Sequence, residues 1–202
     1  MKQCYLCGEE LIKNKNKSRD HVPPDCIFPQ DKPANLITIP CCKRCNEEFK
    51  QMDEKMRNFF ALLAGDKSGS VGQIARREVL RSRKWSEAFL SYTKKHPTLI
   101  DDTGKPRLVF YFDDDELEAW LIRVVKGLFY RNNGGRISDT AIYKVGKYPQ
   151  FVPQPSDTFP MEKGLKFRPY FVYGVIQEPN NDFWVLIFYD HLIFSVSVDM
   201  IV

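Results

Sequence analysis

The sequence predicts an α+β fold, with a small cysteine-rich module (residues 1–66) followed by a larger α+β domain (residues 67–202). Three observations predict this arrangement. All six cysteines of the 202-residue chain lie within the first 45 residues, and four of them form two Cys-x-x-Cys pairs. Two stretches repeat apolar residues at helical spacing. Three apolar segments near the end alternate with short polar turns, which is typical of an antiparallel meander.

Composition limits the class of protein before any motif is considered. Hydrophobic residues make up 43% of the chain, which excludes wholesale disorder. Thirty basic residues against 26 acidic ones give a net charge of +4, too small by itself to indicate a nucleic-acid partner. The sequence shows no apolar leader and no apolar run near the ~20 residues of a membrane-spanning helix. We therefore expect a soluble, cytoplasmic protein with no membrane partner.

The two cysteine pairs, Cys4-x-x-Cys7 and Cys42-x-x-Cys45, have the spacing of zinc knuckles. A two-residue gap lets two thiolates on one turn face a single ion, and a second turn completes a tetrahedral shell. The pattern predicts a structural Zn²⁺, and unliganded reduced thiols are the alternative. Cys41 competes with Cys42 as a ligand, but only Cys42 has the required spacing. Cys26 is interpreted as a small buried hydrophobe.

Thirty-four residues separate the two knuckles, and they hold the other polar motifs. A basic run without acids leads into the pair Asp20-His21, and its members are Lys13, Lys15, Lys17 and Arg19. Residues 36–39 are predicted as a short strand after Asn35. A helix is predicted from near Glu47 to Ala64, with Asn46 at its start. The predicted order is knuckle, strand with Asp-His, strand, knuckle, helix.

This arrangement resembles the zinc-supported form of the HNH (His-Me finger) endonuclease family over about the first 60 residues. Asp20-His21 is similar to the opening acid-histidine pair, Asn35 to the central asparagine, and Asn46 to the third motif residue. The resemblance implies a ββα-metal fold and hydrolysis of phosphodiester bonds with one divalent ion. It also favours DNA over RNA as substrate, and it implies that Asn35 braces the hairpin and orients His21.

The residue types suit this chemistry. Hydrolysis of a phosphodiester needs a base to activate water, and an imidazole, which titrates near neutral pH, suits that role, so we expect His21 to be the base. Oxygen ligands from Asp20 and Asn46 suit Mg²⁺ or Mn²⁺. The four basic side chains are candidates for phosphate contacts. Simpler interpretations stay open: Asn35 as a turn residue, Asn46 as a helix cap, and the basic run as a solvated loop.

The remaining chain shows no motif that identifies its role. Residues 65–70 are a predicted junction, and residues 71–95 a basic helix. Residues 108–112 are a predicted strand, and a helix capped at the triple aspartate 113–115 is predicted to end at 132–135. The closing strands are predicted at 171–177, 183–189 and 192–198, with His191 in a turn. Substrate positioning, formation of a homo-oligomer and binding of a protein partner all stay open for residues 67–202.

Two classes of function therefore follow from the sequence. The first is a metal-dependent HNH-type endonuclease. The second is a noncatalytic zinc module that binds nucleic acid or a protein partner, which includes a degenerate copy that keeps zinc and loses catalysis. A structural zinc scaffold without a nucleic-acid role is a third interpretation.

Overall fold

The computed structural model describes residues 2–28, 32–64, 98–100, 102–104, 106–108, 113–148, 169–190 and 192–200, and the single helical positions 73, 77 and 81. The predicted junction at 65–70 lies outside the described residues, as does most of the predicted basic helix. The short hairpin of β3 (Thr98–Ile100) and β4 (Pro106–Leu108) includes only the first residue of the strand predicted at 108–112, since 109–112 are not described.

The N-terminal module has a β-β-α order. Strands β1 (Lys17–His21) and β2 (Thr38–Cys42) form an antiparallel hairpin, and the 3-10 turn η1 (Asp25–Ile27) lies in their connection. Helix α1 (Lys43–Ala64) begins directly after β2. The second strand is shifted along the chain relative to the predicted residues 36–39. Its ladder with β1 runs from the His21–Thr38 pair to the Lys17–Cys42 pair, so it takes in both Cys41 and Cys42. The helix starts four residues before the predicted position, at Lys43.

Helix α4 (Asp114–Asn133) agrees with its sequence prediction at both ends. The Asp113 carboxylate accepts hydrogen bonds from the backbone N–H groups of Asp115 and Glu116, which caps the helix. Gly134 ends it with φ of +73°, a conformation that glycine adopts without a Cβ penalty. The predicted apolar stripe is buried, and its members are Leu117, Trp120, Leu121, Val124, Val125 and Leu128.

A four-stranded antiparallel sheet with the order β5-β8-β7-β6 makes up the other side of the fold. Strands β6 (Phe171–Gln177), β7 (Asn181–Phe188) and β8 (Leu192–Asp199) confirm the predicted meander. Strand β5 (Ile142–Tyr148) is not predicted by the sequence. It contains two lysines and a glycine, so its local pattern is weak. It forms a strand at the sheet edge because it pairs with β8, which is distant in the sequence.

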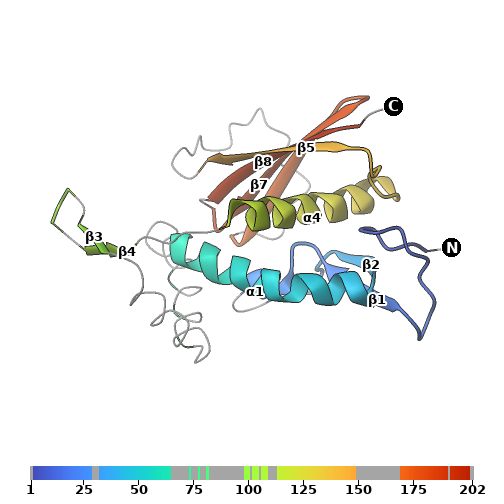
Figure 1. Ribbon diagram of the computed structural model, residues 1–202, viewed down its shortest axis with the longest axis horizontal. Coiled ribbons are helices and arrows are strands. Elements are labelled where there is room, and N and C mark those ends of the chain that lie inside the picture. Colours follow the sequence, from blue (N-terminus) through green and yellow to red (C-terminus); the bar gives the residue numbers. More distant parts are fainter. Residues whose placement is uncertain are drawn as a thin grey trace.

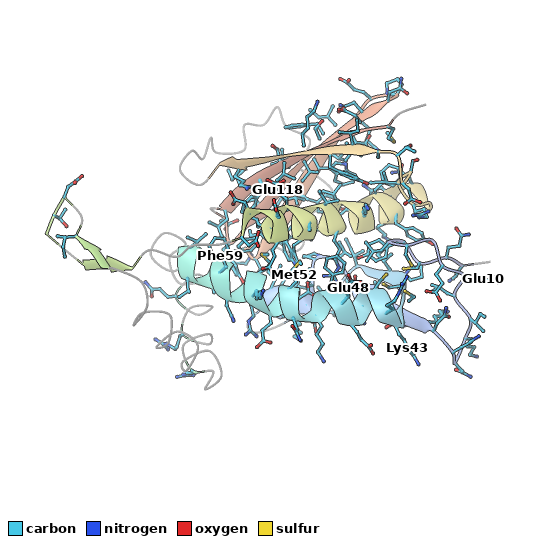
Figure 2. The ribbon with its side chains drawn as sticks, viewed as in Figure 1. Glu10, Lys43, Glu48, Met52, Phe59 and Glu118 are labelled. Carbon is cyan, nitrogen blue, oxygen red and sulfur yellow. The ribbon has the colours of Figure 1, made fainter. Side chains whose placement is uncertain are left out.

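Helix α4 lies between this sheet and the layer formed by α1 and the β1–β2 hairpin (Figure 1). The two helices run antiparallel to each other in the same view. The Phe60 ring of α1 lies 5.5 Å from the Trp120 ring of α4 and 4.8 Å from the Phe188 ring of β7. Met52 and Phe59, on the side of α1 that faces α4 in Figure 2, are partly buried against the same core.

This core is continuous across the three layers, because one cluster of buried residues draws on the N-terminal module, α4 and the sheet. Such a mixed fold of antiparallel sheets and helices with an N-terminal ββα unit confirms the predicted fold class. The predicted domain boundary near residue 66 falls outside the described residues. In the described part of the chain, no helix is long and apolar enough to cross a bilayer.

Candidate functional site

Four cysteines come together where β2 meets α1. The Sγ atoms of Cys4, Cys7, Cys42 and Cys45 all lie within 4.8 Å of one another, and those of Cys7 and Cys42 are 3.8 Å apart. Ligand sulfurs around a tetrahedral zinc with Zn–S bonds of about 2.3 Å lie about 3.8 Å apart, so the donor set fits zinc. Among the described residues, this is the one group of three or more Cys, His, Asp or Glu ligands close enough to share an ion.

Cys41 lies beside this cluster and does not belong to it. Its thiol is 3.8 Å from the Sγ atom of Cys4, and both side chains are fully buried. The contact with Cys41 lowers the pKa of Cys4 to about 3, and the same contact raises the pKa of Cys41. The Sγ atom of Cys41 is not one of the four that lie within 4.8 Å of one another, which agrees with the preference for Cys42 as the fourth ligand.

His21 ends strand β1 and is partly exposed. Side chains alternate along a strand, so Lys17, Arg19 and His21 share one face of β1, and the burial pattern agrees with this. Among the described residues, no side chain makes a hydrogen bond to the His21 imidazole. The predicted basic residues Lys13 and Lys15 are exposed on the turn before β1, and Lys17 and Arg19 are exposed on the strand.

Asp20 faces the opposite way, into the protein, and is only 4% exposed. Its carboxylate accepts two hydrogen bonds of 2.7 Å from Nη2 of Arg123 and one of 3.2 Å from Nε of the same residue. The Tyr5 hydroxyl donates a fourth bond of 2.6 Å. The sequence analysis predicts Asp20 as a ligand of the catalytic divalent ion, but its oxygens already have partners, so they do not fit an open metal site.

Arg123 comes from α4 and pairs with a second carboxylate. Its Nη1 atom forms an ion pair with Asp53 of α1, which also accepts a hydrogen bond of 2.8 Å from the Trp120 indole. The guanidinium lies 4.6 Å from the centre of the Phe49 ring, a cation–π contact. One buried cation therefore joins β1, α1 and α4.

The pKa shifts in this cluster follow from burial and charge. Burial raises the pKa of Asp53, and the nearby Arg123 offsets part of that rise. Burial also raises the pKa of Tyr5, and the Asp20 charge raises it further. For Arg123, burial lowers the pKa, but Tyr5, Asp20 and Asp53 together raise it above its ordinary value. The guanidinium is thus charged at any physiological pH.

The two predicted asparagines lie in different surroundings. Asn46 is the fourth residue of α1 and its Nδ2 atom donates to the Ser18 hydroxyl at 3.1 Å, so it is inside the helix and is not its cap. Its contact places it on the same side of β1 as Asp20. Asn35 is exposed in a turn three residues before Thr38, the partner of His21 in the hairpin. Among the described residues, no hydrogen bond joins Asn35 to the hairpin.

Sequence reasoning missed Arg123, Asp53 and Tyr5. Arg123 had a signal: it is a charged residue within the buried stripe of α4, beside Trp120 and Val124. A charge at such a position is buried only with a partner. The identity of that partner, 103 residues away, had no signal in the sequence.

Residues 4–61 match the family model described as HNH endonuclease. Together with the ββα order and the four-cysteine cluster, this match identifies the N-terminal segment as an HNH endonuclease module. Comparison with curated proteins and with solved structures gives no match. The family match ends before α4, so it does not include Arg123.

Proposed function

We propose that this protein is an endonuclease that hydrolyses phosphodiester bonds in DNA, with His21 as the general base. The observation that carries the proposal is the exposed face of β1 within an HNH module. His21 stands at the end of that face, in line with the cationic side chains of Arg19 and Lys17. A base beside cations in a row suits a phosphodiester backbone.

The residues of this face have two different roles, binding of phosphates and activation of water. Lys17 and Arg19 hold phosphates on one side of the bond that is cut, and Lys13 and Lys15 extend the cationic row along the preceding turn. The His21 imidazole takes a proton from the attacking water. Cleavage then leaves a 5′-phosphate and a 3′-hydroxyl, as the family resemblance implies.

Two metal roles belong to the proposal. The four cysteines hold a structural Zn²⁺, which fixes the start of the chain to the junction of β2 and α1. The family also implies a catalytic Mg²⁺ or Mn²⁺, which would stabilise charge on the leaving oxygen. Since Asp20 does not fit an open site, Asn46 is the one predicted ligand that is left for this ion.

The test is cleavage of supercoiled plasmid and of single-stranded DNA and RNA, with Mg²⁺, Mn²⁺ or EDTA. We expect wild-type protein to nick DNA, and His21→Ala to lose 10²-fold or more in rate with its zinc content unchanged. Arg19→Gln should weaken DNA binding and reduce its salt dependence. Lys144→Gln is the matched control, since Lys144 is exposed on β5, in the sheet and away from the cationic row of β1.

A second candidate, a noncatalytic zinc module that binds nucleic acid, is favoured by one observation. The carboxylate predicted to bind the divalent ion, that of Asp20, is already paired with Arg123 in the interior. Zinc-loaded protein that binds DNA but cuts neither DNA nor RNA with any divalent ion would establish this candidate and contradict the nuclease. A His21→Ala variant that cuts as fast as wild type would contradict the assignment of the base.

A further inference from the structure

We propose that Arg123, and not a divalent ion, is the cation that pairs with Asp20. Both residues are then positioning residues for His21 and are not parts of a divalent-ion site. The inference rests on the proposed function for its meaning in catalysis. It adds that residues of α4, outside the segment that matches the HNH family, complete the site.

The carboxylate oxygens of Asp20 have no free coordination position for a second cation. Its two oxygens accept four hydrogen bonds, three from the Arg123 guanidinium and one from Tyr5. Mg²⁺ and Mn²⁺ require several oxygen ligands and usually keep waters, but Asp20 is 4% exposed. A divalent ion at the same oxygens would also lie beside the positive guanidinium at low dielectric.

The Arg123 side chain cannot easily leave its buried position beside Asp20. It is 2% exposed and is held by the ion pair with Asp53 and by the face of Phe49. The Trp120 indole fixes Asp53 in turn. If Arg123 moved out, the buried Asp20 and the partly buried Asp53 would lose the one cation that pairs with them among the described residues, and uncompensated buried charge is strongly unfavourable.

The Asp20–Arg123 pair is connected to His21 through the face of α4 that carries Arg123. Residues four apart lie on one face of a helix, so Arg123 and Gly127 of α4 face the same strand. Arg123 holds Asp20, the residue before His21. A Cβ built on Gly127 would lie 2.5 Å from Cγ2 of Val22, the residue after His21. The same face of α4 therefore holds both chain neighbours of His21 and, through the backbone, sets the direction of its Cα–Cβ bond.

Binding of Mn²⁺ tests the ion assignment without reference to activity. Zinc-loaded wild type and Asp20→Asn are titrated with Mn²⁺ and followed by electron paramagnetic resonance. We expect the two affinities to agree within about two-fold. A single Mn²⁺ site in wild type that Asp20→Asn weakens 10-fold or more would overturn the proposal. An anomalous peak at coordination distance from an Asp20 oxygen in a Mn²⁺-soaked crystal would overturn it without any variant.

Cleavage and NMR test the positioning role. Arg123→Met should lower kcat 10-fold to 100-fold with KM within about two-fold, since a small misplacement of a catalytic group costs this much. Arg123→Lys, which keeps the charge but loses the forked geometry, should recover part of the loss. The ring resonances of His21 should shift in Arg123→Met, and with three histidines in the chain they can be assigned by substitution.

Lys55→Met is the matched control, because the exposed Lys55–Glu116 pair (2.7 Å) also joins α1 to α4 but does not touch Asp20. It should leave kcat and the His21 resonances unchanged. An equal effect of Lys55→Met and Arg123→Met would overturn the proposal, because any loosening of the two helices would then explain it. If wild type cuts no nucleic acid, the proposed function fails, while the Mn²⁺ and NMR measurements still decide the inference.

Discussion

Replacing Gly127 with alanine tests how closely α4 approaches the strand that carries His21. An added Cβ would lie 2.5 Å from Cγ2, 3.0 Å from Cγ1 and 3.2 Å from Cβ of Val22. Val22 is 2% exposed, and its β-branched side chain has little rotamer freedom. The flanking residues His21 and Pro23 limit backbone adjustment, so we expect α4 and the strand to move apart.

Two opposing terms set the size of the effect. Alanine gains about 1 kcal/mol over glycine from helix propensity. Carbon atoms in contact prefer about 3.5–4.0 Å, so the closest pair is short by about 1 Å or more. Overpacking of this kind costs about 1–3 kcal/mol, and a rigid neighbour places it at the upper end. The net expectation is a loss of about 2 kcal/mol in the free energy of unfolding.

Urea denaturation followed by circular dichroism measures this loss, with zinc kept constant. Thermal unfolding should show a decrease of about 4–8 °C in Tm. Ala119→Gly, at an exposed position of the same helix, is the control that isolates helix propensity and should cost about 1 kcal/mol. In a Val22→Ala background the Gly127→Ala change should become neutral or stabilising, because the conflicting methyl groups are gone.

The reasoning is refuted if Gly127→Ala stabilises the wild-type protein by about as much as Ala119→Gly destabilises it. That result would mean that propensity alone acts at this position and that Val22 yields without cost. A penalty that persists unchanged in the Val22→Ala background would also refute it, since the clash would then lie elsewhere.

Three further predictions concern the helix cap and the cysteines. Asp113→Ala should lower the free energy of unfolding by about 1 kcal/mol, because two backbone N–H groups lose their acceptor. Urea titration measures this loss, and the control Asp115→Ala should lower the free energy of unfolding by less. Cys42→Ser should reduce zinc content below one per chain by elemental analysis and lower Tm, whereas Cys26→Ser should retain full zinc. Desolvation raises the pKa of the partly buried Cys26 to about 12, so its thiol stays protonated between pH 7 and 9. Iodoacetamide should therefore modify it more slowly than a cysteine peptide, as mass spectrometry can show, and rapid modification in folded protein would contradict the raised pKa.

The parts of the fold that the sequence predicted well depend on local geometry. Two cysteines with two residues between them share one turn whatever surrounds them, and the Asp113 cap and Gly134 end of α4 are set by their own backbone. The strands β6, β7 and β8 were likewise predicted from local features, namely apolar segments separated by short polar turns. Strand β5 was missed, because it lies at the sheet edge and is held by pairing with β8, which is distant in the sequence, and not by a pattern of its own.

For the candidate site, the sequence determined that the four clustered cysteines, Asp20 and His21 lie in one small module, and that strand alternation sends Asp20 and His21 to opposite faces. It could not determine what Asp20 meets on its inner face. A carboxylate pointing inward is stable with a metal ion, with water or with a guanidinium, and the choice depends on which helix packs there. Only the tertiary structure brings Arg123 from 103 residues away to that position.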